Sequence, residues 1–144
     1  MRRRLWLSVL LALVWACTLF ANHQLTFEER VEAQRAIERV YYNHRIWPEE
    51  NPGPKPPFES MVSDDDIIHK VETYLTKSSA LQQYWSQSIT VEQLQGELER
   101  MGRETMDPEV LKEIFSALGY HPGLIAECLA RPWLVDRLLR DRKS

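Results

Sequence analysis

Helix-start signals recur along this sequence and restrict it to a helical fold. Thr26–Glu29 and Thr90–Gln93 have the pattern of a capping box, in which a hydroxyl and a side chain three residues later satisfy free amide groups. Ser63 precedes three aspartates, and Asp107 precedes Pro108, and both arrangements are typical of a first helical turn. Strand-like alternation of apolar and polar residues is nearly absent. The sequence therefore predicts an all-α fold of about six helices.

Apolar residues follow each of these starts at helical spacing, which predicts one buried face per helix. The first such helix is expected to run from Thr26 to Trp47. Gly119 is expected to end the helix that Asp107 begins. Pro122 and Pro132 are expected to open two short helices, at 124–130 and 133–140. The predicted core positions are Ala33, Ala36, Ile37, Val40, Tyr41, His44, Ile67 or Ile68, Val71, Tyr74 or Leu75, Ser78, Leu94, Leu98, Met101, Val110, Leu111, Ile114, Phe115 and Leu118.

The first 21 residues have the pattern of an export signal. Arginines at positions 2–4 precede an uncharged apolar run from Leu5 to Ala21. As a helix this run would be about 25 Å long, shorter than the ~20 residues usual for a bilayer crossing, which favours a cleaved signal. Cys17 is a candidate for lipidation, and an uncleaved anchor formed by residues 5–21 remains open. The sequence thus predicts an exported protein, periplasmic or membrane-anchored on the outer side.

Proline content divides the rest of the chain. Residues 48–57 contain five of the eight prolines, which predicts an extended, semi-rigid spacer. The expected organisation is a signal or anchor (1–21), an amphipathic helix (22–47), a spacer (48–62) and a helical domain (63–144). Residues 54–57 are alternatively a polyproline ligand for a partner module.

Charge and chemistry exclude several functions. Loss of Arg2, Arg3 and Arg4 with the signal would change the net charge from −3 to −6, and an acidic domain without a basic stripe argues against nucleic acid as a partner. No histidine or acidic spacing indicates a metal site, and no cofactor motif is present. A pair of Cys128 with His121 is the one formal nucleophile, but a lone cysteine among apolar residues favours a core position. We expect no catalytic residues and regard enzymatic activity as the least favoured class.

Aromatic residues are the better indication of function, because a small helical domain cannot bury all of them. Aromatic and methionine side chains on a groove can hold varied apolar segments. The predicted peptide-contacting residues are Tyr42, Trp47 and Phe58, beside the proline segment, together with Tyr84 and Trp85.

The segments Lys70–Leu75, Ile89–Met101, Asp107–Gly119 and Ile125–Arg140 resemble the helical N-terminal domain of periplasmic SurA-type chaperones and related parvulin-type foldases. This chain departs from that family in its N-terminal helix and proline segment, and we expect no isomerase domain in it. The resemblance implies binding of unfolded or exported polypeptides in extended form, without isomerase catalysis. The alternative is a membrane-tethered interaction module that docks one specific partner.

Overall fold

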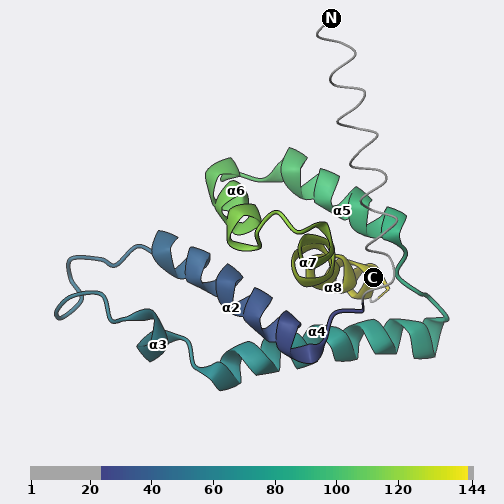
Figure 1. Ribbon diagram of the computed structural model, residues 1–144, viewed down its shortest axis with the longest axis horizontal. Helices are drawn as coiled ribbons and strands as arrows, with labels where there is room; N and C mark the ends of the chain where they lie inside the picture. The colour runs from purple at the N-terminus through teal and green to yellow at the C-terminus, as the bar shows by residue number, and fades with distance from the viewer. Residues whose placement is uncertain (1–23, 143–144) are drawn as a thin grey trace, which may run out of the picture.

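The computed structural model describes residues 24–142, and these residues form helices and loops with no strand, which confirms the all-α prediction (Figure 1). The predicted signal or anchor, including Cys17, lies outside the described residues. None of the described helices has the length and apolarity needed to cross a bilayer. The elements are α2 (Phe27–His44), α3 (Phe58–Met61), α4 (Asp64–Trp85), α5 (Val91–Glu104), α6 (Pro108–Ala117), α7 (Pro122–Leu124), the π-helix η1 (Ile125–Ala130) and α8 (Arg131–Asp141).

The predicted helix starts are confirmed by their hydrogen bonds. The Thr26 hydroxyl accepts from the Glu29 amide at 3.1 Å, and the Glu29 carboxylate accepts from the Thr26 amide at 2.7 Å. Ser63 and Thr90 begin α4 and α5 with the same reciprocal pair of bonds. Asp107 accepts from the Val110 amide at 3.2 Å, with Pro108 in the first turn of α6. Local chemistry therefore fixes where these four helices begin.

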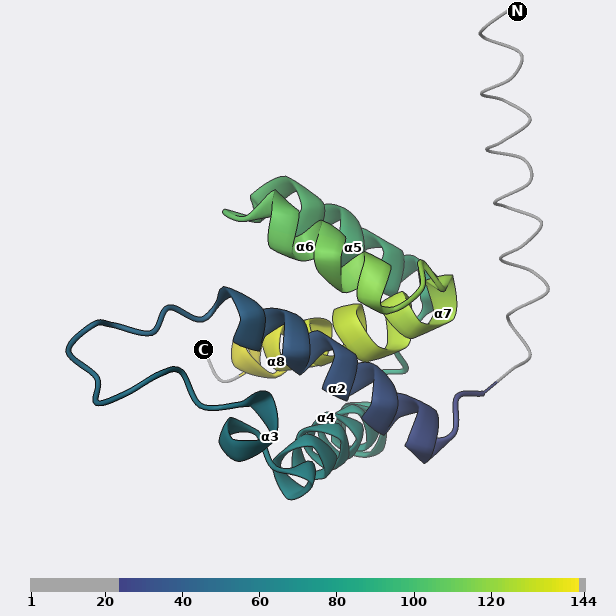
Figure 2. The same cartoon turned by 60° about the vertical axis from the view of Figure 1, so that its left-hand side comes forward.

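The C-terminal helix is the centre of the packing. Figure 2 shows α5 on one side of it and α4 on the other, and contacts join α5 to η1 and α4 to α8. α6 packs directly against α2. Most of the predicted stripe of α2 is buried in this core, although Tyr41 and His44 are exposed. The main buried cluster is Ala33, Ile37, Val40, Ile114, Leu118, Ile125, Cys128 and Leu129.

The prediction of two separate short helices at the C-terminal end is wrong. The chain is continuously helical from Pro122 to Asp141, and Ile125–Ala130 forms a π-helix within it. The Arg131 amide donates to the Ala126 carbonyl, five residues back, instead of four. Pro132 has no amide hydrogen and its ring needs space beside the preceding turn. The wider π turn provides that space, so the proline does not break the helix.

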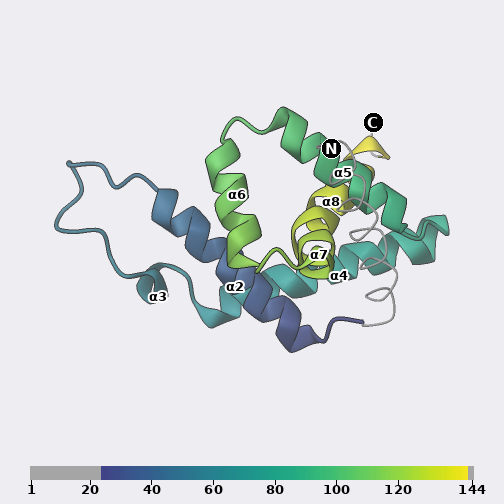
Figure 3. The ribbon, with the colours of Figure 1, turned by 45° about the horizontal axis from the view of Figure 1, so that its top comes forward.

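The proline-rich segment folds back onto α2. The Lys55 ammonium donates to the carbonyls of Tyr42 and Arg45, the latter at 2.8 Å. The last carbonyls of a helix lack partners in the regular helical pattern. Lys55 adds a donor at this end of α2, where the Tyr42 carbonyl also accepts from the Arg45 amide at 3.1 Å. The Tyr42 hydroxyl in turn donates to the Pro56 carbonyl at 2.5 Å. The segment therefore forms a projecting loop whose two ends are held together (Figure 3), and α3 lies within the range predicted as spacer.

Candidate functional site

Three of the predicted peptide-contacting residues lie at the base of this loop. The Phe58 ring is only 3% exposed, because it packs against Tyr42 with ring centroids 5.6 Å apart and lies under the Arg39 guanidinium. Tyr42 is half-buried between Phe58 and Lys55. Trp47 donates from its indole nitrogen to the Gly53 carbonyl at 3.1 Å. Phe58 therefore stabilises the loop. Contrary to the prediction, its ring is covered and does not face a partner.

The other two predicted residues lie at the far end of α4. Tyr84 and Trp85 are 71% and 45% exposed, with ring centroids 6.1 Å apart, and Arg142 lies over the Trp85 ring. α3 lies near the start of α4, and α4 has 22 residues, a length of about 33 Å. The structure thus places the five predicted residues in two separate groups, and they do not form one surface.

A different set of aromatic residues lines a groove between α2, α4 and α8. The groove has a volume of about 640 Å³. Tyr41 of α2 and Trp133 of α8 are 39% and 50% exposed and belong to its lining, and the Tyr74 ring of α4 and Leu129 of η1 are buried parts of the same lining. These residues present apolar surface that solvent can reach, and we call this feature the aromatic groove.

Ion pairs line the aromatic groove alongside the rings. Lys70 of α4 lies 2.7 Å from the Glu38 carboxylate of α2, and Lys77 of α4 lies 2.6 Å from the Asp136 carboxylate of α8. Half-exposed pairs of this kind contribute little to stability, typically ~0–1 kcal/mol. They do supply charged groups of both signs beside the apolar surface. Such groups can form hydrogen bonds with the backbone of a bound polypeptide.

The buried polar groups that line the groove are neutral near pH 7. Burial raises the pKa of the Cys128 thiol to about 11 and that of the Tyr74 hydroxyl to about 12. A thiol held in its protonated form is a poor nucleophile. The arrangement therefore suits reversible binding, and Cys128 occupies the core position that the sequence predicts.

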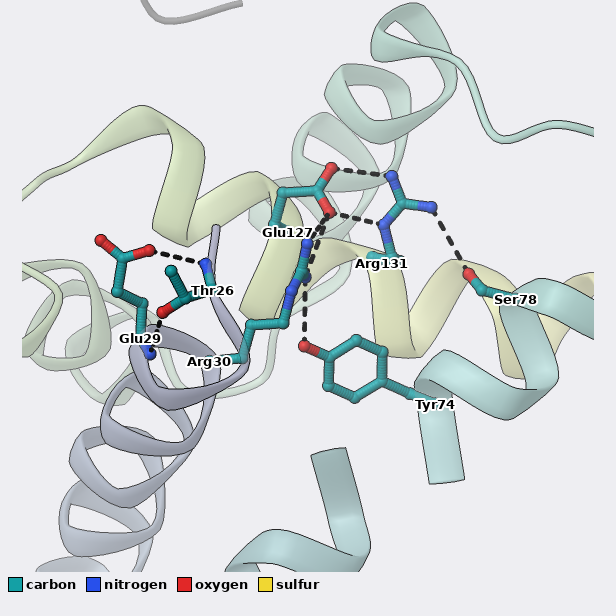
Figure 4. Close-up of polar contacts among 7 residues, drawn as sticks. All are labelled: Thr26, Glu29, Arg30, Tyr74, Ser78, Glu127 and Arg131. Atoms are coloured by element: carbon teal, nitrogen blue, oxygen red, sulfur yellow. Dashed lines mark hydrogen bonds and ion pairs between the residues drawn. The ribbon is translucent and has the colours of Figure 1, made fainter. Parts of the chain in front are cut away.

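A cluster of charged side chains lies behind the Tyr74 hydroxyl (Figure 4). Arg131 binds both oxygens of Glu127, at 2.8 and 2.7 Å, and Arg30 approaches the Glu127 carboxylate at 3.2 Å. Arg30 also donates to the Tyr74 hydroxyl at 3.3 Å, and Arg131 to the Ser78 hydroxyl at 3.4 Å. Burial raises the pKa of Glu127, but hydrogen bonds and charges from Arg131 and Arg30 outweigh it, so the pKa is lowered. The cluster joins α2 and α4 to the C-terminal helix.

Metal-type side chains do not converge in the described part of the chain. Within residues 24–142, no group of three or more histidine, cysteine, aspartate or glutamate side chains is placed to hold a metal ion. Asp64, Asp65 and Asp66 occupy the first turn of α4, where Asp66 closes the capping box with Ser63. Their position is explained by the favourable interaction of negative charge with a helix N-terminus.

Sequence reasoning did not single out Tyr41 and Trp133 as a pair. Tyr41 falls at the edge of the apolar stripe of α2, and Trp133 follows Pro132 directly. Both are visible as aromatic residues, but only the packing of α2 and α8 against the same helix, α4, brings them to one groove. A spacing pattern within one helix carries no information about that packing.

Comparison of the chain with protein families, curated proteins and solved structures finds no match.

Proposed function

We propose that this chain is an exported polypeptide-binding domain of the chaperone type, which holds unfolded or extended segments and has no isomerase activity of its own. The observation that carries the proposal is the aromatic groove, whose exposed rings, Tyr41 and Trp133, belong to different helices. The resemblance of residues 68–140 to SurA-type chaperones supports the same function.

Binding in the aromatic groove would be mainly hydrophobic. Burying apolar surface contributes about 25 cal/mol per Å², and much of that gain offsets the ordering of a flexible client, so affinity is expected to be weak. Aromatic rings accept varied side chains, and the neighbouring ion pairs of Lys70 and Lys77 offer hydrogen bonds to a client backbone. The mechanism needs no cofactor.

The expected place of action is outside the cytoplasm. The arginines and apolar run of residues 1–21 support export, into the periplasm or to a membrane-anchored position facing it. Exported polypeptides that have not yet folded would be the clients. The acidic balance of the remaining chain would keep such complexes soluble.

Light scattering tests the proposal. The purified protein is mixed at increasing ratios with a chemically denatured outer-membrane-type protein as that client is diluted out of denaturant. We expect suppression of aggregation at near-stoichiometric ratios. A Tyr41→Ser/Trp133→Ser variant should lose most of that effect. Trp85→Ser is the matched control, because Trp85 is similarly exposed and lies outside the aromatic groove.

Two outcomes would contradict the proposal. If a tenfold excess of this protein in its folded form does not suppress aggregation of the client, chaperone binding is ruled out. A tethered module that docks one specific partner would then be the better-supported function. Equal losses in the groove variant and in Trp85→Ser would show that general surface hydrophobicity, and not the aromatic groove, causes the effect.

A further inference from the structure

A second cavity, of about 550 Å³, lies between the start of α2, α4, the start of α5 and the π-helix. It shares no lining residue with the aromatic groove. Its volume is within the ~300–1,000 Å³ typical of small-ligand sites. One part of its lining is aliphatic, from Leu75, Leu94 and Ala126, and another is polar, from Arg30, Ser78 and Arg131. We call it the arginine cavity.

The charges in the arginine cavity do not balance. Arg30 and Arg131 carry two positive charges, and among residues 24–142 Glu127 is the only carboxylate within ion-pair distance of either. The side chains of both arginines are mostly covered, at 13% and 18% exposure, so water screens the excess charge only in part. Within the described part of the chain, one positive charge is therefore left without a counter-charge at ion-pair distance.

The hydrogen-bond lengths place this excess on Arg30. Arg131 holds Glu127 through both carboxylate oxygens at 2.7 and 2.8 Å, the range of a charge-assisted pair. The contacts of Arg30 are longer, 3.2 and 3.3 Å to Glu127 and 3.3 Å to the Tyr74 hydroxyl. A guanidinium has five N–H donors, so Arg30 retains donors for a further acceptor.

The backbone beside this charge is also unusual. Ala126 and Glu127, which line the arginine cavity, belong to the π-helix. π turns occur frequently at functional sites. The cavity thus combines a covered excess charge, an aliphatic lining and irregular helical backbone.

We propose that the arginine cavity binds a carboxylate that carries an aliphatic tail, with the carboxylate on Arg30 and the tail against Leu75 and Leu94. The C-terminal residue of a polypeptide has this chemistry, and so does a fatty acid. This site is additional to the aromatic groove, and its test does not depend on chaperone activity.

Fluorescence anisotropy of the full chain tests the proposal. The probes are a fluorescein-labelled hexapeptide that ends in two leucines with a free carboxylate, and the same peptide with a C-terminal amide. We expect amidation to weaken binding about tenfold, the usual effect of losing a hydrogen bond to a charged group. Arg30→Gln should bind both peptides equally weakly. Arg103→Gln, an exposed change of equal charge on α5 outside the cavity, should keep the preference.

A second variant covers the case in which Arg30→Gln does not fold. Ser79 is exposed and lines the arginine cavity, so Ser79→Phe should fill the cavity without disturbing the core and abolish binding of the acid peptide. Competition with decanoate distinguishes a polypeptide C-terminus from a fatty acid as the ligand. Tighter binding of decanoate than of the peptide would assign the site to fatty acids. Equal binding of acid and amide peptides, with no competition by decanoate, would overturn the proposal.

Discussion

The Arg137 guanidinium of α8 donates to the Glu97 carboxylate of α5 at 2.7 Å, although the two residues are 40 positions apart. The Glu97 side chain has no exposed surface, and Arg100 holds its other oxygen at 2.5 Å. This buried carboxylate links the helix that begins at Thr90 to the C-terminal helix. Its effect on stability can be measured.

Glu97→Ala should destabilise the fold. The change leaves Arg100 and Arg137 without their shared counter-charge at a buried position. Because both arginines are partly exposed to water, the loss should be about 2 kcal/mol, below the ~3–5 kcal/mol of fully buried pairs. Urea unfolding followed by circular dichroism gives the value. Glu99→Ala, an exposed neighbour on the same helix, should change stability by less than about 0.5 kcal/mol.

Acid should remove the contribution of Glu97. Burial acts to raise its pKa, but the hydrogen bonds from Arg100 and Arg137 outweigh burial and lower it. A carboxyl group with a lowered folded-state pKa stabilises the fold above its unfolded value of about 4.3, and this contribution is lost as the pH falls through the folded-state pKa. The difference in unfolding free energy between the wild type and Glu97→Gln should therefore be constant from pH 7 to about pH 5 and shrink below pH 4. A difference that stays unchanged at pH 3 would contradict this assignment.

Cys128 should resist alkylation in the folded protein. Its side chain is buried, and burial raises its pKa to about 11, so the reactive thiolate is scarce at pH 8. Mass spectrometry of the peptide that contains Cys128 after iodoacetamide treatment measures the reaction. The same treatment in guanidinium chloride is the control and should modify the residue completely. Rapid modification under native conditions would show that the C-terminal helix opens locally.

Phe58→Ala should cost about 3 kcal/mol, the usual effect of truncating a buried aromatic ring. Trp85→Ala should cost less than about 1 kcal/mol, because Trp85 is partly exposed and its ring packs against the exposed side chains of Tyr84 and Arg142. Thermal unfolding of the two variants compares them directly. Similar losses would mean that Phe58 is not part of the core.

Lys55→Ala should loosen the loop at residues 45–57. The Lys55 ammonium caps the end of α2 through two carbonyls and lies 4.2 Å from the centre of the Tyr42 ring, so its removal should cost about 1 kcal/mol. Protease Glu-C, which cleaves after glutamate, should cut faster at Glu49 and Glu50. Lys112→Ala removes an exposed surface pair and should leave the cleavage rate unchanged.

Local signals in the sequence account for most of the helices. Thr26, Ser63, Thr90 and Asp107 begin the helices that they predict, since a cap depends only on residues within one turn. Gly119 follows α6 with φ +62°, the left-handed conformation that glycine adopts readily. These features need no information about the rest of the fold.

Features that depend on distant contacts were not predictable in this way. The return of the proline segment depends on a lysine reaching the end of another helix, and prolines alone predict only extension. The continuous C-terminal helix depends on a π turn that accommodates Pro132, whereas proline usually begins or ends a helix. The aromatic groove requires α2 and α8 to pack against α4, and no single segment encodes that arrangement.

The π-helix also determines where the sequence can lose one residue without disrupting the fold. A π turn contains one residue more than an α turn, so loss of one residue from Ile125–Ala130 converts it to an α-helix and leaves α8 in nearly the same orientation. The same loss within α4 would rotate every later side chain by about 100° and move Val71 or Leu81 out of the core. A sequence shorter by one residue in this segment would retain the contact of Arg137 with Glu97, but Pro132 would then clash with the preceding turn. Residue 132 should therefore change together with the length of this segment.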